Sequence, residues 1–187
     1  MSIENTIIYL IGPPGVGKLT VAREISTKID ARIVDNHLWL NPVLALVEQD
    51  GVAPLAPEVW HLVRRVRCAV FDTAKNLTPA SWSLILTHAA VEESESDWEI
   101  AREVKDVARC RDARLVTVLL SCSADALAAR VKSPERRVLF KEIDESAARS
   151  NAVRPVFNPH FSETLSLDTT HLSAADAARE IVRFVET

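Results

Sequence analysis

A glycine-rich segment near the N-terminus constrains the fold of this chain more than any other feature. Residues 12–18 read Gly-Pro-Pro-Gly-Val-Gly-Lys and lie between a short apolar run and a stretch with helical periodicity. Glycines in such a segment let the backbone turn with positive φ and bring its N–H groups close to an anion. The helix expected from Gly17 to Ile29 presents free amides to the same anion, and Lys18 adds a full positive charge. The segment therefore predicts a phosphate-binding loop.

The residues of this loop are expected to hold the phosphates of a nucleotide. They are Gly12, Pro14, Gly15, Val16, Gly17, Lys18, Leu19 and Thr20. A glycine turn with a solvated lysine is the structural alternative, but the strand-like run before the loop and the helix after it favour phosphate binding.

The rest of the chain alternates between short apolar runs rich in β-branched residues and longer stretches with helical periodicity. The predicted strands are Thr6–Ile11, Ala31–Val34, Ser83–Thr87, Leu115–Leu120 and Thr164–Leu167. Helix N-caps are predicted at Ser96, Ser123, Ser133 and Ser173. The alternation requires right-handed crossovers, so it predicts a doubly wound α/β domain. In such a domain helices cover both faces of a five-stranded parallel sheet, and ligands bind at the carboxyl ends of the strands.

Composition and charge limit the kind of protein this chain can be. Its 187 residues suit one domain, since 48% are hydrophobic and no repeat or long linker divides the chain. The apolar run Ile7–Ile11 is too short to cross a bilayer and no basic residue precedes it, so a cytoplasmic protein is expected. A net charge of -4 gives no global attraction to nucleic acid or acidic membranes. We expect a small-molecule ligand and a monomer or homodimer, with the cysteines as reduced packing residues.

The residue after Lys18 departs from the usual phosphate-loop pattern, which has Ser or Thr there to ligate Mg²⁺. Leu19 stands in that position and Thr20 follows it, so Thr20 is the candidate magnesium ligand. The ending Gly-Lys-x-Thr resembles the adenylate kinase pattern, and Gly-x-x-Gly-x-Gly-Lys resembles the loop shared by adenylate, shikimate and gluconate kinases, which are P-loop small-molecule kinases. The runs 34–37 and 133–137 resemble an uncharacterised branch of kinase-like P-loop proteins.

This resemblance has implications for fold and cofactors. It implies a nucleoside-monophosphate-kinase-like sheet with strand order 2-3-1-4-5, and the use of ATP and Mg²⁺. It also implies an acceptor-binding insertion at about residues 38–78 and a lid at about residues 131–150.

Asp35 ends the second predicted strand, which we expect to lie next to the phosphate loop. In shikimate-kinase-like enzymes an acidic residue at this place contacts the acceptor hydroxyl, and such a carboxylate can take the hydroxyl proton late in transfer. The alternative is an Asx turn or a cap of the next helix. Asn36 and His37 are weaker candidates for acceptor binding, since polar residues after a strand are also common in turns.

Arg67 is a candidate for binding an anionic group of the acceptor. In the resembling kinases an arginine from a helix of the acceptor-binding region often does this, and Arg64, Arg65 and Arg67 all lie in the predicted helix Pro57–Leu77. Their spacing puts them on different faces, so most of them are expected to be solvated.

His88 follows the third predicted strand, where motor-type P-loop ATPases carry Asp or Glu for the metal. The missing acid argues against an ATPase motor or a switch GTPase. Thr87 or His88 is a candidate for contacting the acceptor or metal-bound water, and a histidine hydrogen-bonded at a strand end is the alternative. The acidic run Glu92–Glu99 is expected to be a solvated loop and cap without a chemical role.

Arg130 and the basic segment after it resemble the Leu-x-x-Arg pattern and later arginines of kinase lids. The resemblance implies that Arg130 stacks on adenine and that Arg136 or Arg137 stabilises charge on the transferring group. The alternative is an exposed helix whose arginines pair with neighbouring acids.

Taken together, these features predict an ATP-dependent phosphotransferase acting on a hydroxyl or phosphate of a small molecule. Its catalytic residues are predicted to be Lys18, Asp35, Arg136 and Arg137. A non-catalytic ATP-binding sensor and a simple NTP hydrolase are the alternatives.

Overall fold

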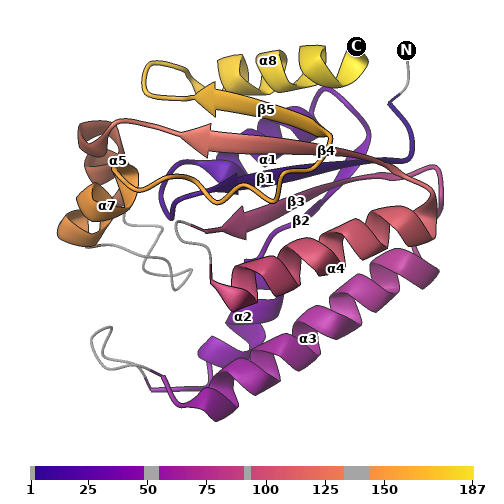
Figure 1. Ribbon diagram of the computed structural model, residues 1–187, viewed down its shortest axis with the longest axis horizontal. Coiled ribbons are helices and arrows are strands. Elements are labelled where there is room, and N and C mark those ends of the chain that lie inside the picture. Colours follow the sequence, from indigo (N-terminus) through magenta and orange to yellow (C-terminus); the bar gives the residue numbers. More distant parts are fainter. Residues whose placement is uncertain (1–2, 49–54, 91–93, 133–143) are drawn as a thin grey trace.

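The computed structural model describes residues 3–48, 55–90, 94–132 and 144–187, which form one sheet with helices on both of its faces (Figure 1). The sheet has five strands, which all run parallel in the order β2-β3-β1-β4-β5. The strands are β1 (Thr6–Gly12), β2 (Ala31–Val34), β3 (Ser83–Ala89), β4 (Arg114–Ser121) and β5 (Glu163–Asp168). The predicted doubly wound fold and its strand order are confirmed. The expectation that the second strand lies next to the phosphate loop is wrong, because β3 separates β2 from β1.

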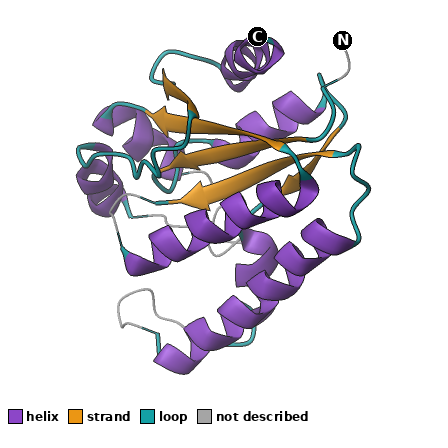
Figure 2. Ribbon diagram, turned by 45° about the vertical axis from the view of Figure 1, so that its right-hand side comes forward, coloured by secondary structure: helices purple, strands orange, loops and turns teal. Residues whose placement is uncertain are grey.

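Helices cover the sheet in two layers. They are α1 (Lys18–Ser26), α2 (His37–Leu44), α3 (Pro57–Asn76), α4 (Glu95–Arg111), α5 (Ala124–Val131), α7 (Glu145–Ala152) and α8 (Ala174–Glu186). The pair α1 and α8 packs on one face and the pair α3 and α4 on the other (Figures 1 and 2). Every residue of β1 is buried, with Ile8 and Leu10 in the core under α1 and α8. Ile7, Tyr9 and Ile11 face the core under α3 and α4, as a central parallel strand requires.

Serine is the N-cap of three described helices, α4, α5 and α8. Ser123 and Ser173 cap α5 and α8 as predicted. Helix α4 begins two residues earlier than expected: Ser94, not Ser96, is its N-cap, and it forms a capping box with Asp97. The predicted cap at Ser133 lies outside the described residues. Within the described part of the chain, no helix is both long and apolar enough to cross a membrane.

The guanidinium group of Arg111 fastens α4 to the loop between α3 and β3. It donates hydrogen bonds to the carbonyl oxygens of Ala74 at 2.8 Å, Thr78 at 3.1 Å, Pro79 at 2.9 Å and Trp82 at 2.8 Å. Only 7% of Arg111 is exposed. A buried cation is thus stabilised by four carbonyl groups of the last turn of α3 and the loop that follows it.

Candidate active site

The phosphate loop joins β1 to α1 at the carboxyl edge of the sheet. Gly15 and Gly17 have φ angles of 96° and 105°, which favour glycine. A Cβ on Gly17 would meet no described atom within 4 Å, so the space beside this residue is open. Gly17 is also the N-cap of α1, where the first amides of a helix have no intrahelical acceptor. Open space, free amides and the positive end of the helix dipole make this loop suitable for binding an anion.

Gly12 contributes to the loop in a different way from the other two glycines. Its φ angle is not positive, so the expectation of a left-handed turn at this residue is wrong. A Cβ on Gly12 would lie 2.4 Å from the carbonyl oxygen of Leu120 in β4. Glycine is therefore required here by the close approach of two backbones.

Lys18 folds its side chain back onto the loop. Its Nζ donates hydrogen bonds to the carbonyl oxygens of Gly12 at 2.8 Å and Pro13 at 2.9 Å, and only 8% of the residue is exposed. Leu19 is half-buried and Thr20 is exposed on the first turn of α1. Among the described residues, no cluster of three or more His, Cys, Asp or Glu could hold a metal ion. The role of Thr20 as a magnesium ligand stays a prediction.

Asp35 and Thr87 connect the carboxyl ends of β2 and β3. Oδ1 of Asp35 accepts hydrogen bonds from the backbone N of His37 at 3.1 Å and from ring Nδ1 at 2.8 Å. Oδ2 accepts from the hydroxyl of Thr87 at 2.9 Å, and that hydroxyl accepts from the backbone N of Asn36 at 3.0 Å. The structure therefore contains the predicted Asx turn, and it places Asp35, Asn36, His37 and Thr87 together at the carboxyl edge.

The protonation state of Asp35 follows from these bonds. Burial raises the pKa of its carboxyl group, but the hydrogen bonds and positive charge of His37, together with the hydrogen bond of Thr87, outweigh burial and lower the pKa to about 2. Asp35 is therefore ionised at neutral pH.

His88 is part of a buried chain of polar side chains rather than an open site. Its Nε2 lies 2.9 Å from Oδ1 of Asp97, and its Nδ1 lies 2.5 Å from the hydroxyl of Tyr9. Burial lowers the pKa of the imidazole despite its bond to Asp97, and the charge of Lys18 lowers it further. Since both ring nitrogens have protein partners, the predicted contact of His88 with the acceptor is corrected to a structural role at the strand end. The expectation that the acidic run is only solvated is also wrong at Asp97.

Arg67 joins α3 to α4 in place of its predicted contact with the acceptor. Its Nε lies 2.7 Å from Glu103 Oε2, and its Nη2 lies 2.8 Å from Glu99 Oε2. Arg64 pairs with the other oxygen of Glu99 at 2.7 Å. Arg67 is 5% exposed and already shared by two carboxylates, which would repel an anionic acceptor. The predicted anion-binding role of Arg67 is therefore corrected to a helix-to-helix ion pair.

Arg130 binds both the phosphate loop and the loop after β5. Its Nη1 donates to the carbonyl oxygen of Val16 and to Oγ1 of Thr169, both at 3.0 Å, and its Nη2 donates to the Thr169 carbonyl oxygen at 2.7 Å. These bonds use the edge of the guanidinium plane, so stacking of its face on a base stays a prediction. Arg136 and Arg137, the predicted catalytic lid arginines, lie outside the described residues.

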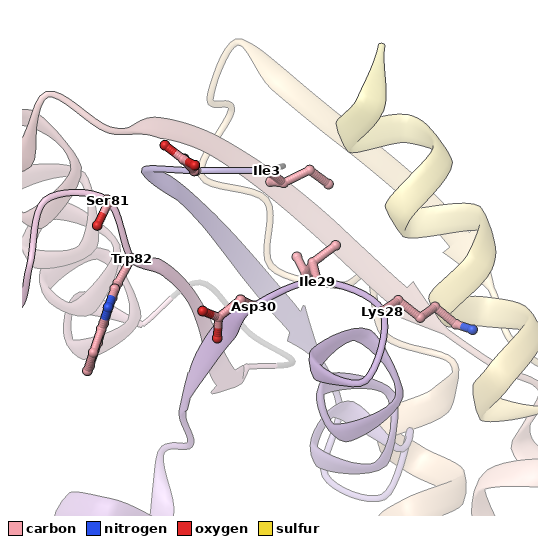
Figure 3. A pocket seen from close by; sticks show the side chains of 7 residues that line it. Ile3, Lys28, Ile29, Asp30, Ser81 and Trp82 are labelled. Atoms are coloured by element: carbon pink, nitrogen blue, oxygen red, sulfur yellow. The ribbon is translucent and has the colours of Figure 1, made fainter. Parts of the chain in front are cut away.

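A separate pocket of about 370 Å³ lies at the opposite, amino-terminal edge of the sheet (Figure 3). It is lined by Ile3, Glu4, Lys28, Ile29, Asp30, Ser81 and Trp82. These residues precede β1, β2 and β3, whereas the phosphate loop follows β1. This pocket is therefore not the phosphate site.

The solved structures that are similar to this chain share one fold. No protein-family model and no curated protein sequence matches the chain. Among solved structures, a gluconokinase from Sinorhizobium meliloti is 15% identical with a TM-score of 0.64, covering 97% of this chain and 92% of its own. The APS kinase of Mycobacterium tuberculosis, solved with AMPPNP and APS, is 15% identical with a TM-score of 0.61, covering 98% of this chain and 99% of its own. A shikimate kinase from Acinetobacter baumannii in complex with shikimate is 17% identical with a TM-score of 0.53, covering 97% of this chain and 93% of its own. The chain therefore has the fold of the P-loop small-molecule kinases.

Proposed function

We propose that this protein is an ATP-dependent phosphotransferase that moves the γ-phosphoryl group to a hydroxyl or phosphate of a small molecule. The supporting observation is the placement of Asp35 and its partners at the same edge of the sheet as the phosphate loop, with β3 in between. Neighbouring strands lie about 4.8 Å apart, so the ends of β1 and β2 are separated by roughly 10 Å. That separation leaves room for a small acceptor between the phosphates and Asp35.

Each part of the site has a role in this proposal. The loop amides and Lys18 hold the phosphates, Arg130 lies beside the base, and Asp35 helps to orient the acceptor. Arg136 or Arg137 neutralises charge on the transferring group. Thr20, directly or through a bound water, would hold magnesium, which would supply positive charge against the charge that develops on the phosphates. Catalysis then consists of positioning and electrostatic stabilisation.

Incubation with Mg-ATP and defined pools of acceptors tests the proposal. The pools are sugars and sugar acids, cyclic polyols, and nucleoside phosphates, with products detected by mass spectrometry. We expect a phosphorylated product with the wild type and none with Lys18→Met. Lys28→Met is the matched control, because Lys28 is exposed beyond the end of α1 and far from the loop.

The same assay separates the alternatives. Tight ATP binding without transfer to any acceptor or to water would contradict the proposal and favour an ATP-binding sensor. Phosphate release at a rate that no acceptor changes would contradict it in favour of a hydrolase.

A further inference from the structure

We infer that His37, through its Nε2, takes the proton of the acceptor hydroxyl, and that Asp35 is a positioning residue that holds the His37 ring. The inference rests on the proposed phosphoryl transfer and changes which residue carries the proton. Its basis is the geometry of three side chains, those of Asp35, His37 and Thr87.

Asp35 has little capacity left to act as the base. A carboxylate offers about four lone-pair positions, and hydrogen-bond donors already occupy three of them here. Two of these donors belong to His37 and the third is the Thr87 hydroxyl. The side chain is also only 13% exposed. The hydrogen bonds from His37 and Thr87 favour its ionised form, so its carboxylate is a weak proton acceptor.

Nε2 of His37 is available for the role of base instead. Nδ1 donates its proton to Asp35 at 2.8 Å, so the neutral ring carries its free lone pair on Nε2, at the opposite edge. No described residue forms a hydrogen bond with Nε2, and 19% of the side chain is exposed. Asp35 is the charged group that contacts the ring, and no ion pair reaches His37 from the described part of α3, the helix packed on α2.

The carboxylate that holds the ring is itself fixed from a second strand. Thr87 donates to Oδ2 of Asp35 and accepts from the backbone N of Asn36, so the ends of β2 and β3 set the direction of the carboxylate together. His37 is the first residue of α2, and its backbone N and its ring bind the same Asp35 oxygen. This arrangement fixes the tautomer and stabilises the imidazolium that forms on proton transfer.

The transfer step balances with ATP as the phosphoryl donor. The acceptor oxygen forms a bond to the γ-phosphorus while the bond from that phosphorus to the β,γ-bridging oxygen breaks, and ADP leaves with the electron pair. The hydroxyl proton moves to Nε2 of His37. The imidazolium, paired with Asp35, then loses the proton to water after the product leaves.

His37→Asn tests the inference, because its amide N–H replaces Nδ1–H beside Asp35 while Nε2 is lost. With the acceptor identified from the pools, or with water as acceptor, we expect kcat to fall about 100-fold or more. The Kd for ATP should stay within a factor of about two, since no phosphate contact changes, and added imidazole should restore part of the rate. His61→Asn is the matched control, an exposed histidine on α3, and it should behave as wild type. If H37N unfolds, His37→Gln removes the same base.

Asp35→Asn distinguishes a positioning carboxylate from a base. Loss of the carboxylate removes the group that fixes the tautomer of the His37 ring, so kcat should fall, but by less than in H37N, while the Kd for ATP stays within a factor of about two. A wild-type rate and pH profile in H37N, or an inactive D35N beside an active H37N, would overturn the inference and leave the proposed function standing. A wild type that binds ATP but transfers phosphate to no acceptor and not to water would overturn both.

Discussion

The hydroxyl of Thr87 donates a hydrogen bond to Oδ2 of Asp35 at 2.9 Å and so joins the end of β3 to the end of β2. It also accepts from the backbone N of Asn36, a residue that is 8% exposed. One buried hydroxyl thus satisfies a backbone donor and orients a carboxylate at the edge where the phosphate loop lies.

Thr87→Val keeps the shape of the side chain and removes both bonds. The buried N–H of Asn36 loses its acceptor, so we expect the free energy of unfolding to fall by about 1–3 kcal/mol, measured in urea. Thr117→Val is the matched control, because Thr117 is fully buried in β4 and its hydroxyl has no partner in the described structure. That variant should have the same stability as the wild type or slightly more. Equal losses of stability in the two variants would contradict the role of the Thr87 hydrogen bonds.

The stability of the protein should depend on pH through Asp35. Its carboxyl has a pKa of about 2 in the folded protein, below its ordinary value of 3.8. A folded-state pKa below the unfolded value gives stability that is present above the unfolded pKa and is lost as the pH falls through the folded pKa. The shift corresponds to about 2 kcal/mol at neutral pH.

Comparison with Asp35→Asn isolates this contribution from those of other acids. Urea unfolding of both proteins at pH 7, 4 and 2 should show a difference that is largest at pH 7 and becomes small near pH 2. A difference that does not change with pH would show that Asp35 contributes through packing rather than through its charge.

Arg111→Met should destabilise the fold more than any surface arginine does. The methionine can fill the space of the alkyl chain, but four carbonyl groups lose a charged donor. We expect the free energy of unfolding to drop by about 3 kcal/mol or more. Arg109→Met in the same last turn of α4 is the control, since its side chain is 76% exposed and pairs with Asp106 near the surface. The free energy of unfolding of this control should equal that of the wild type. A small change in the free energy of unfolding of R111M would contradict the anchoring role of Arg111.

Local patterns in the sequence were sufficient to predict the sheet and the phosphate loop. The predicted strand Ser83–Thr87 extends to Ala89, and the predicted Leu115–Leu120 extends by one residue at each end. Such runs are recognisable because strands buried on both faces are apolar along their whole length. The loop is recognisable because glycine is needed at fixed positions relative to the strand and the helix.

Contacts between helices could not be predicted in the same way. The partners of Arg67 are Glu99 and Glu103, whose spacing of four residues puts them on one face of α4. No sequence pattern within α4 shows that this face packs against α3. His88 likewise has partners on β1 and α4, and pairing them requires the strand order and the true start of α4. Ser94 and Asp97 have the spacing of a capping box, as do Ser96 and Glu99, so the spacing alone did not distinguish them.

Alanine at Gly17 and at Gly12 should separate ligand binding from folding. At Gly17 a Cβ meets no described atom within 4 Å, but the φ angle of 105° is unfavourable for alanine by about 1–2 kcal/mol. The new methyl group and the strained backbone disturb the amides that face the anion. We expect ATP affinity, measured by calorimetry, to fall at least about tenfold, with Gly17→Ala still folded.

Gly12→Ala should reduce the stability of the fold more than it reduces ATP affinity directly. Its Cβ would lie 2.4 Å from the carbonyl oxygen of Leu120, so β1 and β4 must separate or the strand must bend. Both are costly in a close-packed interior, and a large drop in melting temperature is expected even without nucleotide. If Gly12→Ala melts like the wild type and only ATP binding is lost, then Gly12 belongs to the phosphate site. The close approach of β1 and β4 would then tolerate a side chain because the backbones can shift apart.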